Sequence, residues 1–455
     1  MKRNTKYKDI KLEKIPEEWT IYEISDIAEV IGGGTPSTKV PEYWGGDISW
    51  ITPKDLANFE FRYIRKGVRK ITKKGLDASS AKILPKNTVL LTTRAPVGYL
   101  AIANNEVTTN QGFRSLIPNR GTKSEFLFYL LKNNIAVLKA NATGTTFGEL
   151  SGSVLKSLKF AFPPVEEQET ITKILSDLDS KIELNNQINK NLEQIAQAIF
   201  KRWFFDFEFP DENGEPYKSS GGEMMDSEMG PIPKGWEIAN FNAFVNEISN
   251  GDWGKASASD NYEKKVYCMR GTDIPEICKG KKGKMPLRYI LEKNLNKKVL
   301  CAGDLVIEIS GGSPTQSTGR ATYINQEILS RYDTKLICSN FCKVIKLINK
   351  DYCEYLFLYL RYLYELNIFF NFENGTTGIK NLDIKNLFEK YKIKVPDELT
   401  IIKFRKIIKG LFRKIQENGY ENNKLSNLRD ILLPKLMSGE IRVPINSKAL
   451  ISKNI

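Results

Sequence analysis

Histidine is absent from the chain, whose 455 residues contain none. Its absence excludes Ser–His, Cys–His and histidine–metal mechanisms. Carboxylate and lysine chemistry remain possible, but the sequence contains no motif that would support either one. "GDWGK" (251–255) and "GKKGK" (280–284) lack the spacing of a GxxxxGK[ST] phosphate loop, and "FPPV" (162–165) lacks the polar first residue of a methyltransferase motif. "IGGGTP" (31–36) favours a turn over a nucleotide cradle. The sequence therefore predicts no catalytic site.

Long apolar runs are also missing, because nothing approaches the ~20 apolar residues of a membrane span. The N-terminal "MKRNTKYKDIKLEKIPEEW" is charged and lacks the apolar segment of a secretion signal. We expect a cytoplasmic protein that does not contact a membrane.

Cysteine is scarce, with six residues that all lie in the second half of the chain. A zinc site usually has paired, closely spaced ligands, whereas a single Cys-x-x-x-Cys, "CSNFC" (338–342), stands here without histidine. We expect buried free thiols and no bound metal.

Positive charge is in excess, with 68 Lys and Arg against 54 Asp and Glu, a net charge of +14 and a pI near 9.2. This balance favours a polyanionic partner through steering and counterion release, although lysine-rich composition alone does not establish one. With 41% hydrophobic residues, the chain is long enough for two or three globular domains.

An internal repeat organises the sequence. "IPEEWTIYEISDIAEV" around Trp19 is matched by "IPKGWEIANFNAFVNEI" around Trp236, and "NTVLLTT" (87–93) is matched by "GDLVIEI" (303–309). A third match joins "GTTFGELSGSVLKSLKFAFPP" (144–164) to "GTTGIKNLDIKNLFEKYKIKVP" (375–396). In both copies, alternating apolar residues end at proline and a helical pattern begins. The repeat predicts two mixed α/β bodies of ~150 residues, each followed by a long helix.

The two helical segments share a heptad seam with asparagine at equivalent positions. These are Asn185 and Asn189 in the first segment and Asn418 and Asn422 in the second. Buried asparagine costs stability unless it is paired, and an antiparallel pair in register would place Asn185 against Asn422 and Asn189 against Asn418. We expect the four residues to fix register and orientation. The alternative is an ordinary amphipathic helix on each domain.

An antiparallel coiled coil would also separate the two bodies. A helix of ~33 residues is ~50 Å long, which would place one body at each end. Bodies held in this way could bind two half-sites on one DNA, with centres at most ~15 base pairs apart at ~3.4 Å per base pair.

Basic clusters at 61–74 and 279–298 occupy the same place in both repeats, ahead of the matching strands. Lysine and arginine there would contact phosphates, and polar residues on loops would contact base edges. A solvated charged face and ordinary turns are the alternatives. The candidate DNA-binding residues are Thr35, Ser37, Lys39, Thr52, Lys54, Arg62, Arg65, Arg69, Arg94, Asn110 and Gln111 in the first body and Lys255, Arg270, Lys281, Lys282, Gln316 and Arg320 in the second.

The whole pattern resembles the specificity subunits of type I restriction-modification systems. The resemblance covers nearly the whole chain and is carried by "YWGGDISWITPKDL" (43–56), "LLTTRAPVGYLAIA" (90–103), "TNQGF" (109–113), the proline-to-helix boundaries and "NNKLSNLRDILLPKLMSGEIRV" (422–443). It implies an α+β fold, with two mixed α/β target-recognition domains in internal repeat separated by a long antiparallel two-helix coiled coil. The implied segments are target-recognition domains at 1–163 and 231–396, conserved helical regions at 164–210 and 397–443, a linker at 211–230 and a tail at 444–455.

The resemblance also implies a function. The chain would be a non-catalytic subunit that recognises a bipartite, asymmetric site in double-stranded DNA and binds no cofactor itself. It would scaffold two methyltransferase subunits, which use S-adenosylmethionine to methylate adenine, and restriction or translocase subunits, which use ATP and Mg²⁺. Phe200, Arg202 and Phe204 would either contact a methyltransferase or pack against their own domain. A coiled-coil adaptor without a nucleic-acid role and a stand-alone nuclease are the alternative functions.

Overall fold

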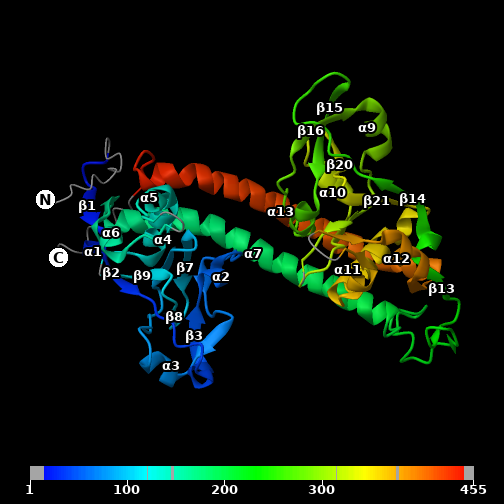
Figure 1. The fold of residues 1–455 in the computed structure, drawn as a ribbon, viewed down its shortest axis with the longest axis horizontal. Helices are drawn as coiled ribbons and strands as arrows, with labels where there is room; N and C mark the ends of the chain where they lie inside the picture. The colour runs from blue at the N-terminus through cyan, green and yellow to red at the C-terminus, as the bar shows by residue number, and fades with distance from the viewer. Residues whose placement is uncertain (1–14, 120, 145–147, 314, 376–378, 445–455) are drawn as a thin grey trace. The chain divides into compact units, whose positions relative to one another are not determined.

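The computed structural model describes residues 15–119, 121–144, 148–313, 315–375 and 379–444 (Figure 1). Contacts divide the chain into two compact units. Unit 1 is Met1–Glu183 with Leu425–Ile455, and unit 2 is Leu184–Lys424. Two long helices, α7 (Val165–Phe204) and α13 (Glu398–Met437), each begin in one unit and end in the other. The expected tail at 444–455 lies almost wholly outside the described residues.

Unit 1 is built on a five-stranded sheet in the order β2-β9-β6-β7-β4, in which only β4 and β7 pair in parallel. Its strands are β2 (Ala28–Gly32), β4 (Tyr63–Ile64), β6 (Val89–Thr93), β7 (Val97–Ala103) and β9 (Phe113–Pro118). The apolar side chains of α4 (Ser124–Asn133) and of the unit 1 ends of α7 and α13 form one core with this sheet. The "VLLTT" strand is buried at every position, which explains its apolar run.

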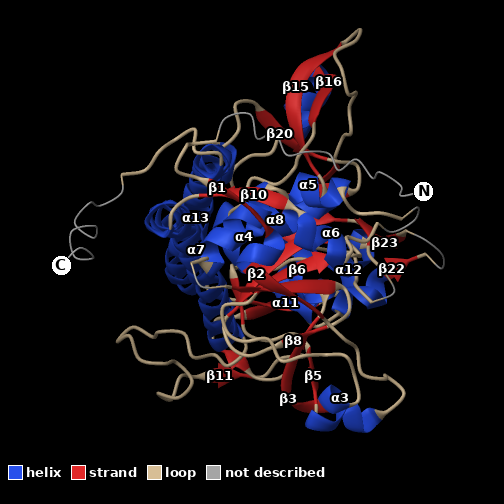
Figure 2. Cartoon of the chain, turned by 90° about the vertical axis from the view of Figure 1, so that its left-hand side faces the viewer, coloured by secondary structure: helices blue, strands red, loops and turns tan. Residues whose placement is uncertain are grey.

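A smaller sheet, β5-β3-β8, lies farther from α7 than α4 does (Figure 1). Its strands are β3 (Trp44–Ile51), β5 (Arg69–Ile71) and β8 (Thr108–Thr109); β3 pairs antiparallel with β5 and parallel with β8. The same arrangement, with α3 on the side away from α4, is visible in Figure 2. The remaining elements of unit 1 are β1 (Thr20–Glu23), α1 (Ile24–Ile27), η1 (Pro41–Tyr43), α2 (Pro53–Leu56), α3 (Lys73–Asp77), α5 (Ile135–Ala140), α6 (Gly152–Ser157) and β10 (Lys159–Phe162).

Unit 2 repeats this topology. Its larger sheet has the order β14-β21-β17-β19, and its smaller sheet has the order β16-β15-β20, again with one antiparallel and one parallel pairing to the central strand. The strands are β14 (Val245–Asn250), β21 (Cys342–Leu347), β17 (Leu305–Glu308), β19 (Ala321–Tyr323), β16 (Leu287–Leu291), β15 (Tyr262–Met269) and β20 (Lys335–Cys338). The pair β1–β10, which leads into α7, has its equivalent in β13 (Glu237–Asn240) and β24 (Lys392–Val395), which lead into α13.

The other elements of unit 2 connect and cover these sheets, and α11 packs on β19. They are β11 (Met224–Met225), β12 (Ile232–Pro233), η2 (Phe241–Phe244), η3 (Gly271–Asp273), α8 (Ile274–Cys278), α9 (Glu292–Lys298), β18 (Ser310–Gly311), α10 (Gln326–Leu329), η4 (Lys350–Tyr352), α11 (Cys353–Glu365), η5 (Ile368–Phe372), β22 (Glu373–Asn374), β23 (Lys380–Leu382) and α12 (Ile384–Lys390).

The two long helices exceed the length that the heptad seam predicts. Each has 40 residues, or ~60 Å, instead of ~33 residues. The unit 2 end of α7 is stabilised by aromatic packing, because Phe200 and Phe204 are 2% and 1% exposed in the core of unit 2. The ring of Phe204 lies 4.6 Å from that of Tyr355 and 4.7 Å from that of Phe404. Of the two alternatives, packing against their own domain is therefore confirmed for Phe200 and Phe204, whereas Arg202 is exposed.

The sequence predicts buried free thiols, and the structure agrees only in part. All six cysteines are free, but Cys278 is half-buried and Cys301 is exposed, so burial applies only to the other four.

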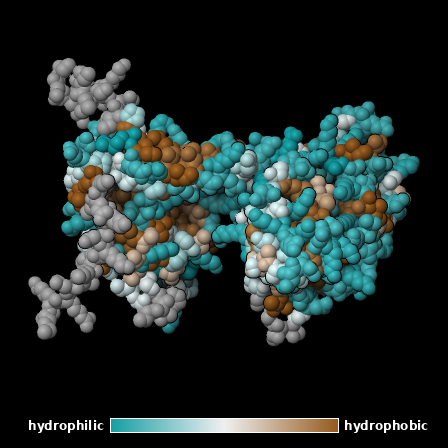
Figure 3. All heavy atoms as spheres, turned by 90° about the horizontal axis from the view of Figure 1, so that it is seen from above, coloured by the Kyte–Doolittle hydropathy of each residue, from teal (hydrophilic) through white to brown (hydrophobic). Residues whose placement is uncertain are grey.

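Among the described helices, none is long and apolar enough to cross a membrane. The face drawn in Figure 3 is mostly hydrophilic, with hydrophobic residues gathered in separate patches.

Candidate nucleic-acid interface

The glycine-rich loop after β2 is held against the loop before β9. Gly34 N donates to Thr109 O at 2.9 Å, and a Cβ on Gly33 would lie 2.0 Å from Asn110 O. Glycine is therefore required for a close backbone approach. This approach brings together two predicted contact residues, because the exposed Thr35 hydroxyl donates to the Gln111 side-chain oxygen.

Unit 2 makes the same approach with a different sequence. Asp252 N donates to Cys338 O at 2.8 Å, and a Cβ on Gly251 would lie 2.0 Å from Ser339 O. "GDWGK" thus takes the place of "GGGTP", and "CSNFC" takes the place of "TNQGF". The exposed Lys255 lies in this loop, with its ammonium 4.5 Å from the centre of the Tyr262 ring.

Two predicted base contacts are used inside their own loops. The Thr52 hydroxyl donates to Asp55 Oδ2 at 2.6 Å, and the Arg270 guanidinium donates to both oxygens of Asp273, with Nε–Oδ2 2.9 Å and Nη2–Oδ1 3.1 Å. A second bond from Arg270 Nη2 reaches Lys284 O at 2.8 Å. Both residues therefore anchor their own loops, and contact of either one with a base stays a prediction.

The carboxylates that hold these anchors also reach the next loop. Asp55 accepts from Thr52 N at 2.7 Å and from Val68 N at 2.8 Å. Asp273 accepts from Arg270 N and from Lys284 N, both at 3.0 Å. Burial alone would raise the pKa of the Asp273 carboxyl, but the hydrogen bonds from Arg270 and Lys284 outweigh it and place the pKa below its ordinary value. The Thr-x-x-Asp capping pattern of "TPKD" is the sequence signal that could have identified Asp55.

A group of polar side chains lies beside the 110–112 loop. Arg94 and Arg114 share the carboxylate of Glu149, at 3.8 and 3.6 Å. Asn110 folds back on its own loop, because its side-chain oxygen accepts from Gly112 N at 3.0 Å. The sequence predicts Arg94 and Asn110 but misses Arg114, whose position inside strand β9 gave no indication of exposure.

The first basic cluster divides into one structural residue and several exposed ones. Arg62 is 8% exposed, and its guanidinium donates to Glu183 Oε1 at 3.1 Å and to Ser180 Oγ at 2.6 Å on α7. A buried, paired guanidinium is not available to phosphate, so Arg62 is corrected to a structural ion pair. Arg69 stacks on Trp44, with 3.4 Å from its guanidinium carbon to the ring centre. The exposed candidates are Ser37, Lys39, Lys54, Arg65 and Arg69, joined by Lys66 and Lys70.

The candidates of unit 2 also divide into structural and accessible residues. Arg320 Nε donates to Oε2 of the buried Glu308 at 2.8 Å, so Arg320 is also corrected to a structural ion pair. Lys281 Nζ lies 3.3 Å from Glu276 Oε2. Lys282 is exposed, with its ammonium 5.4 Å from the centre of the Tyr332 ring. Gln316 is exposed and donates to Tyr364 Oη at 3.1 Å.

The four seam asparagines lie in unit 2, and the structure brings together both pairs that the antiparallel register predicts. Asn185 Nδ2 donates to Asn422 Oδ1 at 2.9 Å, and Asn418 Nδ2 donates to Asn189 Oδ1 at 2.8 Å. None of the four is more than 7% exposed. Asn189 also donates to Ile415 O and Lys279 O, at 3.2 and 3.3 Å. Each amide therefore has partners in a buried seam.

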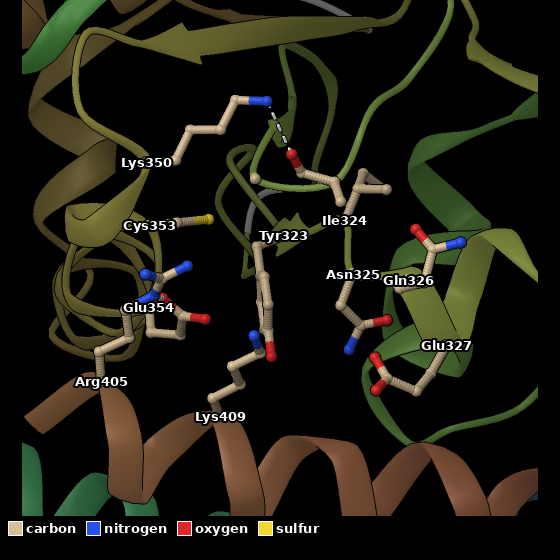
Figure 4. A pocket seen from close by; sticks show the side chains of 12 residues that line it. Tyr323, Ile324, Asn325, Gln326, Glu327, Lys350, Cys353, Glu354, Arg405 and Lys409 are labelled. Atoms are coloured by element: carbon tan, nitrogen blue, oxygen red, sulfur yellow. Dashed lines mark hydrogen bonds and ion pairs between the residues drawn. The ribbon is translucent and has the colours of Figure 1, made fainter.

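A pocket of about 200 Å³ in unit 2 contains titratable side chains but no evident reactive centre (Figure 4). Glu354 on α11 is 4% exposed, and Arg405 Nε on α13 lies 3.3 Å from its Oε2. Burial raises the pKa of Glu354. The pair is best explained as a link between the two helices. Within the part of the chain that the structure describes, no acidic and cysteine side chains group closely enough to hold a metal ion.

Two mixed α/β units with repeated loops and two long helices define a two-domain subunit built on one repeated fold. Residues 16–194 and 233–428 match the family described as type I restriction modification DNA specificity domain, and the chain belongs to this family.

Relatives are similar over nearly the full length. The chain is 37% identical to the type I restriction enzyme MjaIX specificity subunit of Methanocaldococcus jannaschii, covering 96% of this chain and 97% of the relative. It is 25% identical to the HindI specificity subunit of Haemophilus influenzae, covering 93% and 100%. The crystal structure of a type I S subunit from M. genitalium has the same fold, with a TM-score of 0.55, 18% identity and coverage of 93% and 96%.

Membership of this family establishes which subunit of the enzyme complex the chain is. The chain is the DNA specificity subunit of a type I restriction-modification system and has two target-recognition domains. It is a non-catalytic component of an enzyme complex, in which S-adenosylmethionine and ATP belong to the modification and restriction subunits.

Proposed function

We propose that the chain recognises a bipartite, asymmetric site in double-stranded DNA, with one half-site bound by each unit. One observation supports this proposal: the same backbone arrangement of two loops occurs in both units, and it carries different side chains in each. Thr35 and Gln111 in unit 1 stand where Trp253 and Asn340 stand in unit 2. Identical frames favour the same mode of docking on DNA, and different loop residues favour different base sequences.

The proposed contacts are the candidates that remain exposed or half-buried after the corrections. Lysine and arginine side chains would neutralise phosphates, and the shorter polar side chains would reach base edges in the major groove. In unit 1 these residues are Thr35, Ser37, Lys39, Thr52, Lys54, Arg65, Arg69, Arg94, Asn110 and Gln111, with Arg114 added. In unit 2 they are Lys255, Arg270, Lys281, Lys282 and Gln316.

The proposed partners are two adenine methyltransferase subunits and, in the full complex, restriction subunits, all acting on DNA in the cytoplasm. Target recognition would belong to residues 1–163 and 231–396, and subunit assembly to the helical regions 164–210 and 397–443, joined by the linker at 211–230. Arg202, exposed near the end of α7, is a candidate methyltransferase contact. Assembly that survives charge reversal at Arg202 would argue against that contact.

The test is to co-express the chain with the methyltransferase encoded beside it and to map N6-methyladenine across the host genome by single-molecule sequencing. We expect a bipartite motif with a fixed nonspecific gap. Exchange of residues 231–396 for another second target-recognition domain should replace one half-site and preserve the other. An assembled complex that methylates no defined motif would contradict the proposal.

A further inference from the structure

A carboxylate at the end of the central strand of the smaller sheet is used in the same way in both units. Asp55 follows β3 and Asp273 follows β15, and each accepts a backbone hydrogen bond from the residue three positions before it. Each also accepts from a backbone N–H in the loop before the next strand, Val68 N at 2.8 Å and Lys284 N at 3.0 Å. One carboxylate therefore ties two loops together in each target-recognition domain.

The tied loops carry a common pattern. Val68 ends Lys66-Gly67-Val68, and Lys284 ends Lys282-Gly283-Lys284, so each carboxylate holds a Lys-Gly-x segment. The side chains of Lys66 and Lys282 are exposed. In unit 1 the tied loops line one cleft, with Lys54, Lys66 and Lys70 among the residues at its wall.

Capping alone does not explain this arrangement. Asp26 caps α1 by accepting from Glu23 N at 2.9 Å, and Asp383 caps α12 by accepting from Asn386 N at 3.1 Å. Neither bond joins two loops of the smaller sheet. Asp55 and Asp273 differ because their second acceptor bond spans 13 and 11 residues, respectively, to the basic loop. The bond thus fixes a basic segment relative to the loop that follows the central strand.

We propose that Asp55 and Asp273 are positioning residues that set the specificity of their own half-sites. Each holds the proposed DNA-contacting loops in one relative geometry, so that phosphate contacts and base contacts are made in the same register. Direct readout depends on donors placed at hydrogen-bonding distance from base edges, so a loop released by loss of the carboxylate should accept neighbouring sequences. This inference rests on the proposed function.

The test compares Asp55→Ala and Asp273→Ala in the complete methyltransferase complex, with Asp26→Ala and Asp383→Ala as matched capping controls. Domain exchange first assigns each half-site to its domain. We expect Asp55→Ala to lose discrimination by about tenfold or more at one or more positions of the unit 1 half-site, and to leave the other half-site intact. Asp273→Ala should do the reverse, and the controls should leave the motif unchanged.

Two results distinguish this role from a merely structural one. Uniformly weaker methylation with unaltered base preferences, or equal loss in both half-sites, would overturn the positioning role. Asp55→Asn retains one acceptor oxygen and should give an intermediate loss, and it replaces the alanine variant if that variant fails to assemble. A wild-type complex without a bipartite motif would instead contradict the proposed function, before any variant is compared.

Discussion

At the scale of single residues, Asp179 is the centre of a buried charge cluster in unit 1. It is 4% exposed and lies 2.6 Å from Arg429 Nη1, and it accepts from Tyr129 Oη at 2.7 Å. Lys132 Nζ is 3.8 Å from Asp179 Oδ2. Removing this carboxylate takes the buried counter-ion from two half-buried cations, of which Arg429 keeps the exposed Asp430 as a partner, and this is more costly than losing an exposed pair.

We expect Asp179→Asn to lower the free energy of unfolding of unit 1 by about 3–5 kcal/mol. Hydrogen–deuterium exchange in α4 and in the unit 1 ends of α7 and α13 measures this unit separately. Asp177→Asn is the matched control, because Asp177 is exposed and pairs with Lys173 along the helix, and its loss should leave exchange almost unchanged. Equal effects of the two variants would contradict the role of the buried cluster.

The same carboxylate should give unit 1 a pH dependence. Burial alone raises the pKa of Asp179, but Lys132 and Arg429 outweigh burial and place the pKa below its ordinary value of 3.8. The stability that Asp179 contributes is therefore fully present above pH 3.8 and is lost as the pH falls through the lower, folded-state pKa. Asp179→Asn should remove this part of the acid sensitivity, as measured by exchange in a pH series.

Residue types could be predicted from the sequence more readily than their partners. Arg62 and Arg320 have the chemistry of DNA contacts, and their immediate sequence neighbours do not reveal that Glu183 and Glu308 already engage them. Glu183 lies on a helix more than a hundred residues from Arg62 along the chain. Side-chain pairing across such separations is set by tertiary packing, which periodicity does not encode.

At the scale of elements, the heptad pattern correctly indicates helices α7 and α13 and the facing asparagines. It does not indicate what else packs on the pair. Gly419 lies in the middle of α13, where a Cβ would be 1.9 Å from Gly280 O, and Asn189 donates to Lys279 O. The loop after α8 therefore rests directly on the helices in unit 2. A mid-helix glycine, unfavourable by propensity, is required by this contact.

The pairing of Asn189 with Asn418 should be measurable as a coupling energy. Either single change to leucine leaves the other buried amide short of a partner, which costs about 1–3 kcal/mol. The double variant should cost less than the sum of the two singles, by about 1 kcal/mol or more in a double-mutant cycle followed by urea unfolding. Asn191→Leu is the control, because Asn191 is exposed and accepts from Gln187. Strict additivity of the two changes would contradict the pairing role.

At the scale of the whole molecule, composition and the internal repeat indicate a two-domain chain with a polyanionic partner. The family membership agrees with that prediction. The positions at which contacts divide the chain could not be predicted from the sequence. The sequence places boundaries at proline, where strands give way to helices, whereas the two compact units divide inside α7 and α13, near Glu183 and Lys424. A continuous heptad seam has no break at the point where a helix passes from one unit to the other.

Helix length should set the gap between the half-sites. Seven residues inserted between Glu183 and Leu184, together with seven between Asn423 and Lys424, preserve the heptad in both helices. They add ~10.5 Å, which corresponds to about three base pairs at ~3.4 Å each. We therefore expect the methylated motif to keep both half-sites and to lengthen its gap by about three base pairs. Insertion in one helix alone should break the helix register on one side of the insertion, at the Asn185–Asn422 pair or at the Asp179–Arg429 pair, and abolish methylation. A gap that is unchanged by the paired insertion would show that the helices do not determine the spacing.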